Sequence, residues 1–506
     1  MTYYLGIEFG STRIKAVKID ERASVIASGD FTWASSKKDG IWTYDLADAK
    51  EGLKVALKGV GDLSGIAAMG ISGMMHGHLA FDENWNLLVP FRTWQNTVTA
   101  EAAGILTKEF NFNIPQRWSI SHLYQAILND EPHVKNIAHI TTLAGYIHYL
   151  LTGVNAVGAG EASGIFPIDE NCNYDKKMLE KFNVLAKKSG FNKNVEDLLP
   201  EVLPAGKWAG KLTEEGSRLT GGLLPTGIPF APPEGDMGTG MVATNSVTPR
   251  TGNVSAGTSI NAMVVLERPL KKVYEEVDVV TTPSGRFVAM VHCNNCTTDS
   301  NAWISVLGEA AALFGADTDG ELYTKLYRKS LEGAPDCGGV IVCNYISGES
   351  MTGFTSGRPM VIRTEGAELT LANLMRSTLY STMATLKIGM DILYGEGVAI
   401  DSFMGHGGLF KTEGVCQKYL AAAFDAPVSC MTTAGEGGPY GMAVLAAFCH
   451  QCQDGTALED FLANKIFKDT PYTTVCPDRA DVEGFAKYMK LYTEMLRVEK
   501  TATEVL

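Results

Sequence analysis

The sequence lacks an excess of positive charge. Its 43 lysine and arginine residues are outnumbered by 57 aspartate and glutamate residues, which gives a formal net charge of −14, and no basic block occurs along the chain. Proteins that bind nucleic acids or anionic membrane surfaces concentrate basic side chains. The composition therefore argues against both kinds of partner. A small anionic ligand is still possible, because backbone amides can hold it.

Long apolar runs are also missing. No uncharged stretch approaches the roughly 18 residues that a membrane-spanning helix needs, and residues 1–4 lead directly into an apparent strand rather than a signal peptide. The hydrophobic fraction of 45% and the charged fraction of 20% are ordinary for a soluble globular protein. We therefore expect a cytoplasmic protein, and its 506 residues indicate about two or three domains.

The ten cysteines are scattered and form no dense framework. Two CxxC spacings occur, at Cys293 and Cys296 and at Cys449 and Cys452. Two such pairs could build a zinc site. The pairs lie far apart in the sequence, however, and the second follows an apolar run at residues 442–448. Buried free thiols are therefore the favoured explanation, since cysteine commonly packs as a small hydrophobic residue.

The chain also lacks the GxxxxGK[ST] motif of a P-loop. Instead, residues 4–20 alternate apolar and polar side chains on both sides of a small-residue turn at 9–12, which predicts a β-hairpin. Such a turn offers N–H groups and hydroxyls to a phosphate. The adjacent Glu8 could hold a Mg²⁺ ion attached to that phosphate. A plain hairpin turn accounts for the same residues.

Strand and helix signals in the first hundred residues indicate an α/β domain. A third strand at 24–31, a helix at 46–57 and a buried strand at 66–72 follow the hairpin, and this order predicts a mixed sheet. His76 lies just after the buried strand, where ligands bind in α/β sheets, although a structural histidine is an alternative. The segment 94–96 (WQN), which follows a predicted short strand at 87–89, has the composition of a sugar-hydroxyl site or of a surface turn.

One carboxylate, Asp236, stands among small residues in the segment 235–240 (GDMGTG). The apolar residues 228–233 before it predict a short buried strand that prolines end. An acid presented beside glycines can act as general base for a hydroxyl. A tight turn is the alternative, because Gly and Asp are common turn residues.

The opening pattern recurs in the second half of the chain. Residues 246–265 again predict a strand, a turn and a second strand. The turn at 256–259 (AGTS) is similar to the turn at 9–12 (FGST). This repetition predicts two duplicated α/β domains with a boundary near Thr244. Glycine-rich segments at 405–408 and 433–441 precede predicted helices. A helix N-terminus can bind phosphate, so a nucleotide could lie there, although ordinary strand–helix connections are also glycine-rich.

These motifs, taken in order, resemble the FGGY family of carbohydrate kinases, and within it the xylulokinase-like branch. The resemblance covers almost the whole chain. The matching segments are 6–12 (GIEFGST) for the first phosphate loop, 72–77 (SGMMHG) for the sugar segment, 94–96 (WQN), 161–164 (EASG), 235–236 (GD) for the catalytic base, 256–259 (AGTS) for the second phosphate loop and 405–408 (GHGG) for the adenosine site.

The resemblance implies an α/β fold of two ribonuclease-H-like domains of the actin, hexokinase and Hsp70 type, with a central ligand cleft. Residues 1–244 would bind the sugar and residues 245–506 would bind ATP. The implied sugar-binding set is Met75, His76, Gly77, Trp94, Gln95, Asn96 and Asp236. The implied nucleotide-binding set is Gly10, Ser11, Thr12, Lys15, Gly257, Thr258, Ser259, Gly407, Gly408 and Lys411. Glu8 and Asp236 would hold Mg²⁺, and Asp236 would be the general base.

Four positions depart from the family pattern. Glu8 replaces the usual aspartate, and its extra methylene could alter the Mg²⁺ geometry. Asn96 replaces a sugar-contacting aspartate, and its amide can donate as well as accept. Glu234 stands where a glycine is common, and Met74 where a glutamine is common. These departures bear on which sugar is used.

We therefore expect an ATP- and Mg²⁺-dependent kinase that phosphorylates a hydroxyl of a ketopentose or related polyol, most simply D-xylulose. The first alternative keeps the fold and changes the substrate to L-ribulose, erythritol or glycerol. The second is a sugar- or nucleotide-binding regulator that has lost catalysis. A homodimer is common among relatives of this kind.

Overall fold

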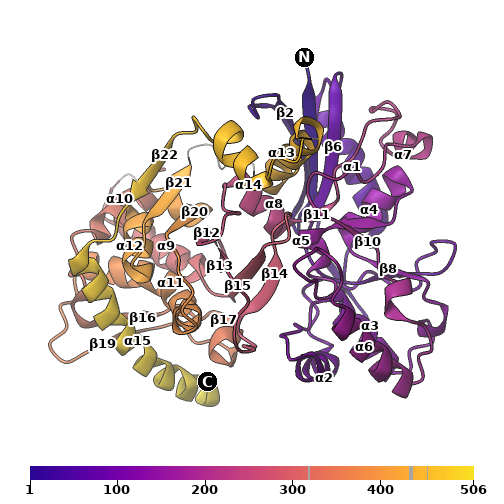
Figure 1. The fold of residues 1–506 in the computed structure, drawn as a ribbon. Coiled ribbons are helices and arrows are strands. Elements are labelled where there is room, and N and C mark those ends of the chain that lie inside the picture. Colours follow the sequence, from indigo (N-terminus) through magenta and orange to yellow (C-terminus); the bar gives the residue numbers. More distant parts are fainter. Residues whose placement is uncertain (317–319, 432–436, 453) are drawn as a thin grey trace. The chain divides into compact units, whose positions relative to one another are not determined.

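The computed structural model describes residues 1–316, 320–431, 437–452 and 454–506. The chain divides into two compact units, and the second half of the sequence contributes to both (Figure 1). The first unit consists of Met1–Thr248, Lys272–Val288 and Gly435–Thr470. The second consists of Pro249–Lys271, Ala289–Ala434 and Pro471–Leu506.

The first unit is built on a five-stranded mixed sheet in the order β11-β6-β1-β2-β3. The predicted hairpin is confirmed, because β1 (Tyr3–Phe9) pairs antiparallel with β2 (Arg13–Asp20). β3 (Val25–Thr32) continues this meander, whereas β6 (Ile66–Gly73) runs parallel to β1. The two-residue strand β11 (Glu234–Gly235) is parallel to β6 and delivers Asp236 at its end.

Two helices cover opposite faces of this sheet. On one face, Ile14 and Phe31 pack against α1 (Leu46–Val60), as predicted for a helix at 46–57. On the other face, Gly6 lies against α13 (Gly437–Gln451), where a Cβ atom would come within 2.0 Å of the Pro439 carbonyl oxygen. Figure 1 shows the yellow α13 beside the indigo strands. A segment from near the end of the chain thus completes the core of the first unit.

The first unit contains further helices and short strands. Its other helices are α2 (Ala100–Phe110), α3 (Ser119–Leu128), α4 (Leu143–Thr152), α5 (Ala159–Ala162), α6 (Lys176–Lys188), α7 (Glu214–Leu219), α8 (Asp236–Ala243) and α14 (Leu458–Phe461). Its shorter strands are β4 (Ser36–Lys38), β5 (Ile41–Thr43), β7 (Leu79–Phe81), β8 (His139–Thr141), β9 (Ala156–Gly158), β10 (Glu201–Leu203) and β14 (Asp278–Thr281).

Two local predictions for this unit were wrong. The predicted strands at 87–89 and 228–233 reduce to isolated bridges at Leu87 and at Pro229 and Phe230. Asp236 does not lie in a turn but begins helix α8. In each case, tertiary contacts decided the local structure of a short segment that periodicity alone could not assign.

The second unit repeats the strand order of the first. β12 (Thr251–Ala256) and β13 (Ile260–Val265) form an antiparallel hairpin, and β20 (Ser402–His406) runs parallel to β12, just as β6 runs parallel to β1. The order β2-β1-β6 therefore recurs as β13-β12-β20. The predicted internal duplication is confirmed at the level of sheet topology.

Helices and short strands complete the second unit. The helices are α9 (Thr297–Leu313), α10 (Leu322–Ser330), α11 (Leu371–Gly395), α12 (Val415–Phe424) and α15 (Arg479–Val505). The other strands are β15 (Phe287–Cys293), which begins in the first unit, β16 (Val340–Cys343), β17 (Ser347–Glu349), β18 (Phe354–Ser356), β19 (Met360–Arg363), β21 (Val428–Met431) and β22 (Tyr472–Val475). Of the predicted glycine-rich segment 433–441, residues 433–436 lie outside the described part of the chain.

The buried His148 on α4 gives a pH-dependent test of the first unit. Its Nε2 atom donates to the Ala209 carbonyl oxygen at 2.8 Å, and burial lowers the pKa of His148 to about 4. The unfolded chain therefore binds a proton at higher pH than the folded chain, and stability is lost as pH falls from about 6.5 towards 4. Between pH 7.5 and 5, we expect this group to cost about 2 kcal/mol.

The variant His148→Gln isolates this contribution, because glutamine keeps an N–H donor but does not titrate. Urea unfolding at several pH values should show a stability difference between wild type and variant that changes by about 1.4 kcal/mol per pH unit below pH 6.5. A difference that stays constant from pH 7.5 to pH 5 contradicts a neutral buried imidazole.

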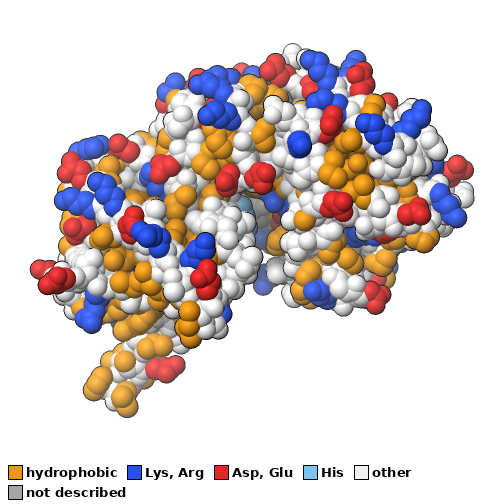
Figure 2. All heavy atoms as spheres, turned by 90° about the horizontal axis from the view of Figure 1, so that it is seen from below, with side chains coloured by type: hydrophobic (Ala, Val, Ile, Leu, Met, Phe, Trp, Pro, Cys, Tyr) orange, Lys and Arg blue, Asp and Glu red, His pale blue; other side chains and the backbone are white. Residues whose placement is uncertain are grey.

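The cysteines lie mainly in the core. Cys293, Cys296 and Cys449 are buried free thiols, as predicted, whereas Cys452 is partly exposed. The described residues contain no group of three or more potential ligands that could hold a metal ion. None of the described helices is both long enough and apolar enough to cross a bilayer. On the face that Figure 2 shows, described acidic and basic side chains are interspersed, and neither sign forms a single patch.

Candidate functional site

Asp236 is the first residue of helix α8, at the end of the short strand β11. Its Oδ1 atom accepts a hydrogen bond from the backbone N–H of Met75 at 3.2 Å. Burial raises the pKa of Asp236 to about 6, and hydrogen bonds from the Met75 and Met237 backbones oppose this rise. The carboxylate is therefore ionised at neutral pH, with a pKa close enough to 7 to accept and release a proton.

Glu8 lies near the end of β1 and faces the same region of the first unit. Its Oε2 atom is buried and has no hydrogen-bond partner among the described residues. Burial raises the pKa of Glu8 to about 8, the charge of Asp236 adds to this rise, and Lys15, opposite Glu8 on β2, reduces it. The charge of Asp236 thus raises the proton affinity of Glu8, and two carboxylates that face one region can hold a cation.

The predicted sugar segment follows β6 and turns sharply. His76 and Gly77 both have positive φ angles, 70° and 80°, and His76 is 4% exposed. The His76 ring stacks on Trp118 with 6.1 Å between ring centroids, and its Nδ1 atom lies 3.3 Å from the Gly164 carbonyl oxygen. Because a carbonyl can only accept, Nδ1 carries the proton.

The other ring nitrogen of His76 follows from this assignment. Burial and the charge of Arg117 hold the pKa of His76 well below its usual range, so the ring is neutral. Nε2 is then an acceptor, and it is buried without a hydrogen-bond partner among the described residues. An unpaired buried acceptor costs free energy unless a ligand donates to it, and a hydroxyl group is a suitable donor.

The turn between β1 and β2 is held by two aromatic side chains. Trp33 Nε1 donates to the Gly10 carbonyl oxygen and Tyr44 Oη donates to the Ser11 carbonyl oxygen, both at 2.7 Å. Because a trans peptide is planar, the amide N–H groups of Ser11 and Thr12 point to the opposite side from these carbonyls. The turn therefore directs two N–H donors away from the aromatic layer, as an anion site requires.

Trp94 joins the predicted sugar residues to this turn. Its Nε1 atom donates to Ser11 Oγ at 3.2 Å, although the side chain is 39% exposed. Gln95 is partly buried, and its backbone N–H donates to Thr93 Oγ1 at 3.3 Å. The segments 10–12 and 94–95 therefore lie together in the fold, which their separation in the sequence does not indicate.

Asn96 makes a different set of contacts. It is 2% exposed, its Oδ1 atom accepts from the Trp42 N–H at 2.8 Å, and its Nδ2 atom donates to the Trp42 and Thr93 carbonyl oxygens at 2.8 and 3.0 Å. The Asn96 amide thus hydrogen-bonds to both the N–H and the carbonyl group of Trp42 and joins the two segments. These contacts give Asn96 a structural role, and its predicted role in sugar specificity remains a prediction.

Replacing Asn96 with aspartate should lower the free energy of unfolding by about 1–3 kcal/mol, because a carboxylate cannot donate to the Trp42 and Thr93 carbonyls. Chemical denaturation measures this loss. The same replacement at the exposed Asn84 is the control and should change stability little. Stability equal to the wild type in Asn96→Asp is inconsistent with the backbone bridge.

In the second unit, the predicted phosphate residues also come together. The turn after β12 is held by the start of α9, because the Thr297 hydroxyl donates to the Gly257 carbonyl oxygen at 2.7 Å and the Cys296 N–H donates to that of Thr258 at 3.0 Å. Gly407 lies against this turn, since a Cβ atom there would be 2.3 Å from the Ala256 oxygen. Ser259 belongs to this turn, whereas Gly408 begins the short 3₁₀ helix Gly408–Phe410 and Lys411 comes directly after it.

Sequence reasoning missed a group of polar side chains beside His76, of which Asn113 and Asp278 are buried and Arg117 is partly exposed. Arg117 pairs with Asp278, whose segment comes from the second half of the chain, and the Asn113 amide donates to the Val277 carbonyl oxygen and Asp278 Oδ1, both at 3.1 Å. Neither residue belongs to a motif, and 161 positions separate Arg117 from Asp278. No local signal could have found this pair.

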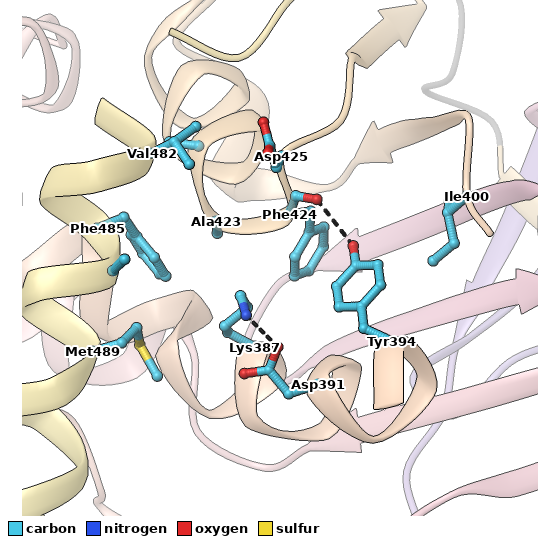
Figure 3. A pocket seen from close by; sticks show the side chains of 12 residues that line it. Lys387, Asp391, Tyr394, Ile400, Ala423, Phe424, Asp425, Val482, Phe485 and Met489 are labelled. Carbon is cyan, nitrogen blue, oxygen red and sulfur yellow. Dashed lines mark hydrogen bonds and ion pairs between the residues drawn. The ribbon is translucent and has the colours of Figure 1, made fainter. Parts of the chain in front are cut away.

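The second unit also contains a pocket of about 560 Å³ among α11, α12 and α15. Figure 3 shows apolar side chains such as Phe485 and Met489 around it, with Lys387 paired to Asp391 and Tyr394 Oη donating to the Phe424 carbonyl oxygen at 3.0 Å. None of the predicted site residues lines it. Its polar groups are engaged with one another, so its contacts indicate no particular ligand.

Comparisons with known proteins agree with this arrangement. The models for the N-terminal and C-terminal domains of the FGGY family of carbohydrate kinases match residues 3–243 and 252–450. The chain is 22% identical over 469 residues to xylulose kinase from Haemophilus influenzae, a match that covers 86% of this chain and 91% of that protein.

Solved structures show the same fold. A crystal structure of xylulose kinase from Brucella ovis superimposes with a TM-score of 0.79 at 19% identity, covering 99% of this chain and 100% of the other. Glycerol kinase from Plasmodium falciparum superimposes with a TM-score of 0.78 at 14% identity, covering 99% and 98%. The predicted two-domain, actin- and hexokinase-like α/β fold is confirmed. The chain therefore belongs to the FGGY family of carbohydrate kinases, enzymes that transfer a phosphoryl group from ATP to a sugar.

Proposed function

We propose that this kinase transfers the γ-phosphate of ATP to a hydroxyl of a ketopentose or related polyol, most simply D-xylulose, with Asp236 as the general base. The observation that carries the proposal is the contact between Asp236 and the loop that bears His76, through the Met75 N–H at 3.2 Å. This contact joins the Asp236 carboxylate to the residue before His76, whose Nε2 atom has no hydrogen-bond partner among the described residues, and it supports the proposal. The similarity to xylulose kinases supports the choice of sugar.

In this reaction the residues of the first unit act on the sugar. Asp236 takes the proton from the attacking hydroxyl, and His76 Nε2 accepts a hydrogen bond from another hydroxyl of the same molecule. Met75, Gly77, Trp94 and Gln95 shape the pocket. Because phosphoryl transfer requires mainly positioning and stabilisation of charge, one base and several fixed donors are sufficient protein chemistry.

Each unit contains candidate phosphate donors of its own. In the first unit these are the N–H groups of Ser11 and Thr12, with Lys15 supplying positive charge. In the second unit they are the segments Gly257–Ser259 and Gly407–Gly408, with Lys411 supplying positive charge. Glu8 and Asp236 fit Mg²⁺, which commonly takes only one or two protein carboxylates and the phosphates of its nucleotide. When bound, the ion neutralises charge on the phosphates.

The proposal is tested by coupled ADP release with ATP, Mg²⁺ and a panel of D-xylulose, L-ribulose, erythritol and glycerol. The expected result is the highest kcat/KM with D-xylulose. Preference for another member would correct the substrate. Absence of turnover with every member, while the protein still binds ATP, would refute the proposal and favour a binding protein that has lost catalysis.

A further inference from the structure

A second acid, Glu234, lies two residues before Asp236 and is almost completely buried, with 1% of its surface exposed. It belongs to β11, where it pairs with Ser72 of β6. Its Oε2 atom accepts from the Glu161 N–H at 3.0 Å and its Oε1 atom accepts from the Gly160 N–H at 3.4 Å. The side chain therefore connects β11, the strand directly before Asp236, with the backbone of α5.

Two glycines, Gly158 and Gly160, leave the space that the Glu234 carboxyl group occupies. A Cβ atom at Gly158 would lie 2.0 Å from Glu234 Oε1, and one at Gly160 would lie 2.5 Å from Oε2. Both positions must lack a side chain for the carboxyl group to reach the backbone. A buried glutamate that needs two glycines beside it indicates that the Glu234 carboxyl group makes a specific contact with the backbone and does not merely fill space in the core.

The segment whose N–H groups bind Glu234 also contacts the His76 ring. The Gly164 N–H donates to the Glu161 carbonyl oxygen at 3.0 Å, and the Gly164 carbonyl oxygen lies 3.3 Å from His76 Nδ1. A Cβ atom at Gly164 would lie 2.6 Å from the same Nδ1 atom. The His76 ring thus rests on the segment 158–164, and that segment is tied to β11 through Glu234.

We propose that Glu234 is a positioning residue for the reaction: it holds the segment 158–164, and with it the His76 ring, in a fixed position relative to Asp236. This inference rests on the proposed function, because it concerns the geometry of the same sugar site. A displacement of about 1 Å between a base and its substrate can cost roughly 10²-fold in rate. The loss should appear with the sugar and not with ATP.

The first test compares Glu234→Ala with Glu234→Gln in steady-state kinetics. We expect alanine to lower kcat/KM for the sugar by about 30-fold or more and to raise the sugar KM, while the KM for ATP changes by less than about twofold. Glutamine keeps the length and one acceptor oxygen, so it should recover most of the activity. The exposed Glu201 on β10, changed to alanine, is the matched control.

Gly158→Ala provides a second, independent variant. Its methyl group would displace the Glu234 carboxyl group and should produce the same defect in the sugar parameters. In a Glu234→Ala background the methyl group has room, so the double variant should be no worse than Glu234→Ala alone. Additive losses in this cycle would overturn the proposal.

Two further results would overturn it. One is a Glu234→Ala enzyme whose sugar kcat/KM stays within about threefold of the wild type. The other is an equal loss of the sugar and ATP parameters together with a lower melting temperature, which indicates general damage. The wild type measured on the same substrates keeps this test separate from the proposed function: no wild-type turnover rejects the function, whereas equal turnover in wild type and Glu234→Ala rejects only the positioning role.

Discussion

Asp236→Asn is expected to lower kcat for sugar phosphorylation by about 10²–10⁴-fold, the usual contribution of a general base. Asparagine keeps the oxygen that accepts from the Met75 N–H, so the loop that carries His76 should keep its position. The amide cannot take a proton from the sugar hydroxyl. The loss should therefore fall on kcat, and the melting temperature should change little. Coupled ADP release with the best substrate of the panel measures it.

The exposed Asp197, changed to asparagine, is the control for this replacement. It removes one negative charge from the first unit without touching the site and should keep full activity. Sugar-dependent turnover by Asp236→Asn at a rate near that of the wild type would show that another group removes the proton. Turnover by Asp236→Ala would also show that another group removes the proton, and in that variant no side-chain amide could contribute.

The second large effect concerns the stability of the second unit. Asp481, 4% exposed on α15, pairs with Arg376 of α11 and with Lys418 of α12 at 2.7 Å, and Arg376 is 2% exposed. Burial alone would raise the pKa of Asp481, but the hydrogen bonds and charges of Lys418 and Arg376 hold it below its usual value. This one carboxylate therefore joins three helices.

Asp481→Asn should destabilise the second unit by about 3–5 kcal/mol, because the buried guanidinium of Arg376 loses its counter-charge. The pair Glu494 and Arg497 on the same helix is highly exposed, with 72% and 83% of the side chains accessible, so Glu494→Gln should cost at most about 0.5 kcal/mol. Chemical denaturation distinguishes the two. An Asp481→Asn variant as stable as Glu494→Gln would show that the buried pair contributes nothing.

The apolar replacement of this pair gives a further check. Arg376→Met combined with Asp481→Leu removes both charges, and such changes are often neutral or stabilising when the volume is kept. The double variant should therefore be more stable than Asp481→Asn. This comparison separates the cost of an unpaired charge from the cost of lost packing.

Much of the fold could be predicted because its signals are local. The hairpin β1–β2, helix α1 and the repeated hairpin β12–β13 follow from alternating apolar residues and from small residues at the turns. Asp236 and His76 were candidates for the same reason, since each follows a strand and has glycine beside it. The structure brings both together in the first unit.

The errors occurred where a segment was too short for its pattern to be decisive. The residues 228–233 are apolar and end in prolines, and they do lie beside β6, since the Met69 N–H donates to the Pro229 carbonyl oxygen and the Ala231 N–H donates to that of Met69, but this contact is only an isolated bridge. Asn96 had the composition of a sugar contact; the structure shows its hydrogen bonds to the backbone at Trp42, and its role towards the sugar stays a prediction. A polar side chain in a sequence does not reveal whether its partner will be a ligand or the chain itself.

The sequence by itself determined the order of the strands and turns, the two candidate phosphate turns and the carboxylate at Asp236, because hydrophobic period, turn residues and glycine act within a few positions. Only the tertiary structure decided the partners of the buried polar groups. Asn96 meets Trp42 across 54 positions, Glu234 meets Glu161 across 73, and Arg376 meets Asp481 across 105. A buried polar group must find a partner wherever the packed chain supplies one, and no local pattern encodes that partner.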